Sequence, residues 1–126
     1  MNSSLTPRKF PLRAHRLGSP DMYRRVKTEG AVLRKFPFSM RYLQAEDIRE
    51  NRIGFVIRKR TGNAPLRNAM RRVLRELFRE LSPTFSRHVW VVFDVTDKAS
   101  ETTRREFRLR AANLLAALPA APGAAA

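Results

Sequence analysis

Cationic side chains gather in the run from residue 58 to residue 80. Eight of them lie there: Arg58, Lys59, Arg60, Arg67, Arg71, Arg72, Arg75 and Arg79. Only Glu76 and Glu80 oppose them with negative charge. A guanidinium group pairs with phosphate through two parallel hydrogen bonds and also stacks on bases. A compact array of such groups on a rigid element is what a polyphosphate ligand requires.

The whole chain is strongly basic, with 26 Lys and Arg against 11 Asp and Glu, a net charge of +15 over 126 residues. Such an excess indicates nucleic acid as the first class of partner and an anionic membrane surface as the second. The chain has no cysteine, which excludes a disulfide framework and a thiolate metal site. It also lacks the apolar run of about 18 residues that a membrane span needs, and the apolar segment of a signal peptide. We therefore expect a cytoplasmic protein.

The length is that of one domain. Residues 1–18 are basic, contain Pro7 and Pro11 and show no apolar period, so we expect a flexible arm. Residues 119–126, PAAPGAAA, are expected to form a disordered tail. The single domain should occupy residues 19–118.

Apolar periodicity and capping residues predict an alternation of helices and strands within that domain. The expected elements are a helix begun by Ser19-Pro20 and stopped by Gly30, a strand over 36–43, an acidic hairpin loop over 46–51, a strand over 53–58, a helix over 64–81, a strand over 89–93 and a helix over 100–118. The order is therefore α-β-β-α-β-α. We expect an α+β two-layer sandwich, in which helices pack on a mixed sheet of four strands or fewer.

The helix over 64–81 is predicted to separate an apolar from a cationic face. Its apolar positions follow helical spacing: Leu66, Met70, Val73, Leu74, Leu77, Phe78 and Leu81. At about 100° per residue, the arginines centre roughly 150° from that stripe. A merely solvated face would mix charges of both signs. Here arginine recurs every four residues from Arg67 to Arg79, and the mutual repulsion favours a nucleic-acid-binding face.

The strand over 36–43 carries an apolar stripe with two interpretations. Phe36, Phe38, Met40 and Tyr42 are either core or a platform on which bases stack. We favour core, because the aliphatic stripe of the next strand also needs a partner layer. The opposite face would then be open, and could hold an extended strand of nucleic acid beside the first helix. The open face comprises Ser39, Arg41, Val56 and Arg58.

Catalytic groups are scarce. His15 and His88 have no companion at a motif spacing. Asp94 and Asp97 are more typical of turn residues than of metal ligands. The sequence contains no glycine-rich phosphate loop, zinc spacing or nucleophile elbow. On its residues alone, the chain does not resemble an enzyme.

The pattern Gly62-Asn63-Ala64, Arg67-Asn68, Arg71-Arg72 and Arg75-Glu76 resembles the signature of the bacterial ribonuclease P protein component. The similarity continues over roughly residues 12–116, through Asp21–Tyr23, Val26–Gly30, Ile53–Ile57 and Val89–Phe93. It implies an RNA-binding domain of small α+β fold with a left-handed crossover. It further implies a subunit of an endoribonuclease that removes the 5′ leader of precursor tRNA. A large catalytic RNA would carry the chemistry with magnesium ions, and no obligate protein partner is expected.

The resemblance also implies two sets of binding residues. The catalytic RNA would contact Lys59, Arg60, Asn63, Arg67, Asn68, Arg71, Arg72 and Arg75. The single-stranded leader would lie in a cleft lined by Tyr23, Lys27, Ser39, Arg41, Val56 and Arg58. Ala69 replaces a residue that is often basic in this motif. Lys27 and Arg41 stand where aromatic residues are frequent, so leader binding should depend on charge more than on stacking.

Two other functions remain open. A general RNA-binding or ribosomal protein of similar fold would explain the charge and the arginine helix, although not the pattern from Gly62 to Glu76. A self-sufficient nuclease would need paired His, Asp or Glu residues, which the sequence does not offer.

Overall fold

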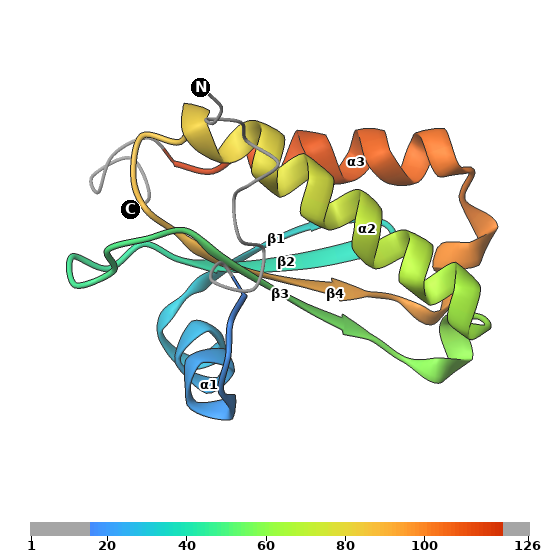
Figure 1. Ribbon diagram of the computed structural model, residues 1–126, viewed down its shortest axis with the longest axis horizontal. Helices are drawn as coiled ribbons and strands as arrows, with labels where there is room; N and C mark the ends of the chain where they lie inside the picture. The colour runs from blue at the N-terminus through green and yellow to red at the C-terminus, as the bar shows by residue number, and fades with distance from the viewer. Residues whose placement is uncertain (1–15, 120–126) are drawn as a thin grey trace, which may run out of the picture.

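A mixed four-stranded sheet with helices on both faces forms the centre of the computed structural model, which describes residues 16–119 (Figure 1). The principal elements are α1 (Pro20–Glu29), β1 (Ala31–Lys35), β2 (Phe38–Leu43), β3 (Arg52–Ile57), α2 (Ala64–Leu81), β4 (Trp90–Val95) and α3 (Arg104–Ala116). Short 3-10 helices η3 (Lys59–Thr61), η4 (Ser82–Thr84) and η5 (Asp97–Glu101) connect them. No helix within these residues is long and apolar enough to cross a membrane.

The strand order is β1-β2-β4-β3. Strand β2 pairs antiparallel with β1 and with β4, whereas β3 pairs parallel with β4. Helix α2 makes the connection from β3 to β4, as a parallel pair requires a long crossover. The α+β class with a mixed sheet is therefore confirmed, and the handedness of the crossover stays a prediction.

Strand β4 is the best-buried strand of the sheet, and it corrects the predicted hairpin. The loop over 46–51 was expected to join two neighbouring strands, but β4 lies between β2 and β3. Val91, Phe93 and Val95 are fully buried and Val92 is nearly so. A strand that is apolar on both faces is stabilised most in the centre of a sheet. Strand β3 therefore pairs with β4 rather than with β2.

The sheet has one strand more than the sequence pattern indicated. The segment expected as one strand over 36–43 begins only at Phe38, and β1 precedes it. Phe38, Met40 and Tyr42 lie in the core, whereas Phe36 is 48% exposed in the connecting turn. Pro37 has no N–H for a strand ladder, so regular pairing starts on either side of it.

Helices cover the two faces of the sheet unequally. Helices α2 and α3 pack on one face, where Met70, Leu74 and Phe107 join the main core cluster (Figure 1). Helix α1 packs on the other face against β2 and β4. There Val26 and Val92 belong to a second, smaller cluster. Of the four residues expected on an open face, Arg41, Val56 and Arg58 line a groove on this side of the sheet, and Ser39 does not.

Capping residues set the helix boundaries. Helix α2 has its predicted bounds, and the Asn63 side chain accepts a hydrogen bond from the Leu66 N–H at 2.9 Å. Ser19 caps α1 in the same way, as expected. Helix α3 begins later than predicted, because Thr103 and Glu106 form a capping box and η5 occupies the preceding residues. A capping box satisfies donors that the first turn leaves unpaired.

The predicted arm of residues 1–18 extends too far into the chain. Leu17 is 3% exposed, and its N–H donates to the Ile53 carbonyl at 3.0 Å. Arg16 forms a parallel bridge with Ile53 at the edge of β3. Residues 16–18 therefore belong to the domain, because Leu17 adds apolar burial on the α1 face. Residues 1–15 and 120–126, most of the predicted arm and tail, lie outside the described residues.

Gly30 allows the end of α1 to approach β2 closely. A Cβ atom at this position would meet the backbone carbonyl oxygens of Tyr42 and Val26. We predict that Gly30→Ala lowers the free energy of unfolding by about 1–3 kcal/mol, because backbone on both sides must move. Urea unfolding followed by circular dichroism measures the change.

Gly18→Ala is the matched control for that substitution. A Cβ there would have the Arg16 carbonyl oxygen as its nearest neighbour, at 4.0 Å. It should stay within about 1 kcal/mol of the wild type. Equal losses at both positions would show that close approach at Gly30 is not the cause.

Candidate nucleic-acid interface

The arginines of α2 lie outside the row of side chains that the helix buries. The helix is anchored by this buried row, which comprises Met70, Leu74, Leu77 and Phe78. Arg72 is exposed, while Arg67 and Arg71 are half-buried. Arg71 donates to the Asn68 side-chain oxygen at 2.9 Å, and Arg67 donates to the Gly62 carbonyl at 2.6 Å. These hydrogen bonds orient two guanidinium groups without neutralising them.

The arginines of α2 have no carboxylate partner in the part of the chain that the structure describes. Within residues 16–119, none of the ion pairs within 4.0 Å includes Arg67, Arg71, Arg72, Arg75 or Arg79. Glu80, at the end of α2, pairs instead with Arg108 of α3 at 3.1 Å. Like charges at adjacent helical turns repel one another. The arrangement therefore favours an anion that bridges several of these groups.

Arg75 is half-buried and lies against an aromatic ring of β3. Its guanidinium carbon lies 5.6 Å from the centre of the Phe55 ring, a distance suited to a cation–π contact. Burial lowers the pKa of Arg75, and the nearby charges of Arg16, Arg71 and Arg72 lower it further. Arg16 thus extends the positive field of the α2 face. The sequence analysis assigned Arg16 to the flexible arm. Arg16 reaches this surface through its bridge to Ile53 of β3, a long-range contact that has no local sequence signal.

The residues just before α2 form the 3-10 helix η3 and the N-cap of α2, and only some of them are free to bind an anion. Lys59 and Arg60 are exposed on η3, and Arg60 forms an ion pair with Asp97 at 3.2 Å. The Asn63 oxygen is engaged in capping α2. Of the eight residues expected to contact the catalytic RNA, two lie on η3, Asn63 is the N-cap of α2, and five lie on the N-terminal two thirds of α2. Among the described residues, Arg60 is the one of the eight that has a carboxylate partner.

A groove of about 470 Å³ lies between α1 and the sheet. Its lining comprises Tyr23, Arg24, Val26, Lys27, Arg41, Val56, Arg58, Val92 and Asp94. Five of the six residues predicted for the leader cleft are among these. The sixth, Ser39, lies outside the lining, paired in register with Asp94. A concave surface with several cations and one aromatic ring suits an extended, charged chain.

Gly54 makes room for the aromatic wall of the groove. A Cβ atom on Gly54 would collide with the phenol ring of Tyr23. The ring therefore lies directly on β3, at the point where that strand has no side chain. This contact and the packing of Val56 against the α1 cluster join α1 to β3.

Asp94 is a groove residue that sequence reasoning missed. It lies in β4 rather than in a turn, and its carboxylate accepts two hydrogen bonds from Arg58, at 2.9 and 3.3 Å. The pair raises the pKa of Arg58. Asp94 therefore neutralises one of the cations expected to bind the leader. The sequence held one indication of this pair: Asp94 is the single charged residue in the otherwise apolar segment that forms β4.

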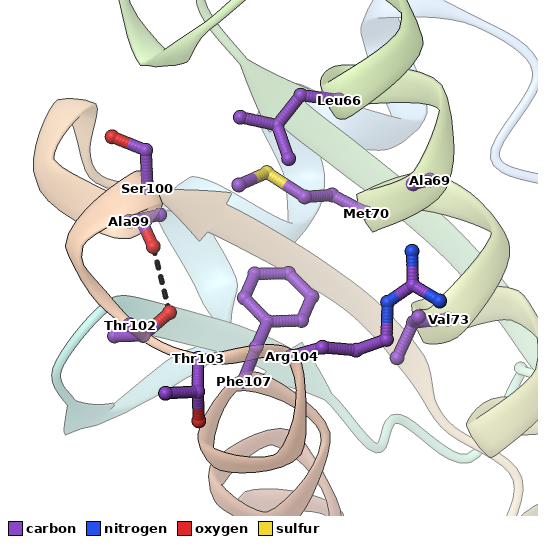
Figure 2. Close-up of a pocket in the computed structure, with 10 residues that line it drawn as sticks. All are labelled: Leu66, Ala69, Met70, Val73, Ala99, Ser100, Thr102, Thr103, Arg104 and Phe107. Carbon is purple, nitrogen blue, oxygen red and sulfur yellow. Dashed lines mark hydrogen bonds between the residues drawn. The ribbon is translucent and has the colours of Figure 1, made fainter.

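A second cavity lies between α2 and the start of α3 (Figure 2). Leu66, Met70 and Phe107 point into it, and the Thr102 hydroxyl beside it donates to the Ala99 carbonyl at 2.6 Å. Its volume of about 100 Å³ is well below the roughly 300–1,000 Å³ of small-molecule sites. We interpret it as a packing gap between the two helices.

Metal ligands are not grouped in the described part of the chain. Within residues 16–119, no three His, Cys, Asp or Glu side chains lie close enough together to hold a metal ion. Asp94 and Asp97 are both paired with arginines. His88 is exposed just before β4, and His15 lies outside the described residues.

Comparison with known proteins agrees with this geometry. A model of the family described as ribonuclease P matches residues 11–118. The ribonuclease P protein component of Roseiflexus castenholzii is 41% identical over 73 residues, covering 56% of this chain and 57% of the relative. That of Chloroflexus aurantiacus is 36% identical over 83 residues, covering 66% and 61%. The chain thus spans about three fifths of the length of these relatives.

The fold has a counterpart among solved structures. A ribonuclease P protein from Staphylococcus aureus superposes with a TM-score of 0.77 at 20% identity, covering 90% of this chain and 96% of that one. At this identity the superposition shows the fold. Because the family model covers most of the chain, this protein belongs to the ribonuclease P protein family.

Proposed function

We propose that this chain is the protein subunit of ribonuclease P and assembles with a large catalytic RNA through the arginine face of α2. The observation that carries the proposal is the cluster of Arg67, Arg71, Arg72 and Arg75, which takes part in no ion pair within residues 16–119 and lies on a helix anchored by buried side chains. Arginine forks match the geometry of phosphate oxygens. A folded RNA presents closely spaced phosphates that relieve the repulsion within this cluster.

The groove supports a second role, binding of the single-stranded 5′ leader of precursor tRNA. Lys27, Arg41 and Arg58 supply positive charge, and Tyr23 supplies the one aromatic ring of the lining. Mature tRNA has no leader, so a protein that holds the leader raises the affinity for precursor relative to product. The enzyme would thereby favour substrate over product without the protein touching the scissile bond.

Magnesium enters the proposal through the RNA. Within residues 16–119, no three His, Cys, Asp or Glu side chains are grouped, and an RNA offers many phosphate oxygens to magnesium. The proposal assigns the hydrolysis of the phosphodiester bond, and the magnesium that supports it, to the catalytic RNA in the cytoplasm. The protein's own residues bind and orient the two RNA molecules.

Cleavage of precursor tRNA at low magnesium tests the proposed function. At low magnesium the catalytic RNA alone should cleave slowly, because too few cations are present to screen the repulsion between the two RNA molecules. Adding the protein should raise the rate by at least tenfold, corresponding to about 1.4 kcal/mol of the activation free energy. Cleavage is followed by gel electrophoresis of end-labelled precursor.

High magnesium provides the control for that experiment, since the RNA alone should then cleave and the effect of the protein should shrink. Absence of stimulation at low magnesium would favour a general RNA-binding role instead. Cleavage by the protein after complete removal of RNA would contradict the assignment of the chemistry to the RNA.

Asp94→Asn should strengthen leader binding. The substitution frees Arg58 from a partner that has 35% of its side chain exposed, and adds one unit of positive charge to the groove. We expect the affinity of the assembled enzyme for precursor tRNA to rise about two- to fivefold, the range of an exposed ion pair. Equilibrium binding to precursor and to mature tRNA measures it, and only the precursor should respond.

Asp47→Asn is the matched control. Asp47 also pairs with an arginine through two hydrogen bonds, from Arg25 at 2.7 and 2.8 Å, and it is not part of the groove lining. The Asp47→Asn substitution changes the net charge of the protein by the same amount as Asp94→Asn. If both variants strengthen binding equally, the effect is one of overall charge and Asp94 has no special place in the groove.

A further inference from the structure

The register of the sheet places one residue of each strand in a row across the face that carries the groove. Val56 of β3 pairs with Asp94 of β4, and Asp94 pairs with Ser39 of β2. Ser39 in turn pairs with Arg34 of β1. Residues directly opposite each other in neighbouring strands project to the same face. Arg34 therefore points to the groove side of the sheet.

The neighbours of Arg34 on β1 confirm this orientation. Leu33 pairs with Met40 and packs in the core beneath α2 and α3. Lys35 pairs with Phe38, which is buried in the same core. Since successive side chains alternate between faces, Arg34 and Lys35 carry equal charge on opposite sides of one strand.

The groove already crosses three of the four strands. Val56 contributes from β3, Asp94 from β4 and Arg41 from β2. The next strand in this direction is β1, at the edge of the sheet. With strands about 4.8 Å apart, the Arg34 backbone lies about 10 Å from that of Asp94 and about 14 Å from that of Val56. A chain that crosses the groove floor in this direction reaches Arg34 next.

Arg34 is available for an anionic ligand. It is exposed, and within residues 16–119 it takes part in none of the ion pairs. The other β1 residue on this face, Val32, is apolar and pairs with Arg41. Arg34 is therefore the one cation that β1 presents on the groove side.

We propose that Arg34 binds a backbone phosphate of the single-stranded RNA after that strand has crossed the groove. The inference rests on the proposed function of the groove. It extends the path of the bound RNA strand from three strands of the sheet to all four. Arg58, Arg41 and Arg34 then supply cations from β3 towards β1. Asp94 lies between them and favours a path in which phosphates pass beside it rather than over it.

Precursor tRNAs with leaders of increasing length test the proposal in the assembled enzyme. For the wild type, affinity should rise with leader length until the strand spans the track. Arg34→Ala should leave the shortest leaders unaffected. It should weaken binding of longer leaders about two- to fivefold and reduce their log–log salt slope by about 0.7, the contribution of one phosphate in a single strand.

Lys35→Ala is the matched control, because it removes the same charge from the adjacent residue on the opposite face. It should change affinity equally little at every leader length. If Arg34→Ala behaves like Lys35→Ala, or weakens mature tRNA as much as long-leader precursor, the proposal is wrong. If the wild type itself shows no dependence on leader length, the proposed function of the groove fails, which is a separate result.

Discussion

The interface depends on the mutual repulsion among the arginines of α2. Burial of the apolar side chains of the same helix holds these arginines close together in spite of that repulsion. The anchor is provided by apolar side chains such as Leu74, which is fully buried between the sheet and α3. Each large buried side chain contributes about 1.5–3 kcal/mol. Repulsion between exposed like charges costs a few tenths of a kcal/mol per pair. The core can therefore hold the charges together in the absence of a ligand.

The two candidate surfaces use different faces of one sheet. Helix α2 lies over the face that contains the main core, and α1 lies over the other face (Figure 1). Residues of α1 and of the sheet line the groove on that second face. Strand β4 is common to both, since Phe93 faces the main core and Val92 faces the α1 cluster. A rigid central strand thus fixes the position of the helix that would bind the catalytic RNA relative to the groove that would bind the leader.

Local patterns predicted the parts of the fold that are locally determined. Helix α2 has both its predicted ends, because Asn63 caps it and its apolar period is unbroken. Strand β1 gave no signal: Ala31, Arg34 and Lys35 are exposed, so the strand is specified by pairing with β2 and not by a buried stripe. Which strand lies beside β3 likewise depends on the burial of β4, a property of the whole sheet.

The site divides in the same way. The alternation of side chains along two predicted strands placed Arg41, Val56 and Arg58 on one face, and the family resemblance added Tyr23 and Lys27; all five line the groove. Arg16 and Asp94 required the tertiary structure. Arg16 reaches the α2 face through its bridge to Ile53, and the Asp94 carboxylate meets Arg58 only because β3 and β4 are adjacent. Contacts between residues far apart in sequence are not encoded in local periodicity.

The salt dependence of assembly with the catalytic RNA tests the role of the α2 face most directly. The wild type should show a steep linear fall of log K with log salt concentration. Replacing Arg71 and Arg72 together by Gln, which keeps helix propensity, should reduce the slope by about 1.8 if each binds one phosphate in a duplex region. An unchanged slope, in a variant that folds as stably as the wild type, would show that the RNA binds elsewhere.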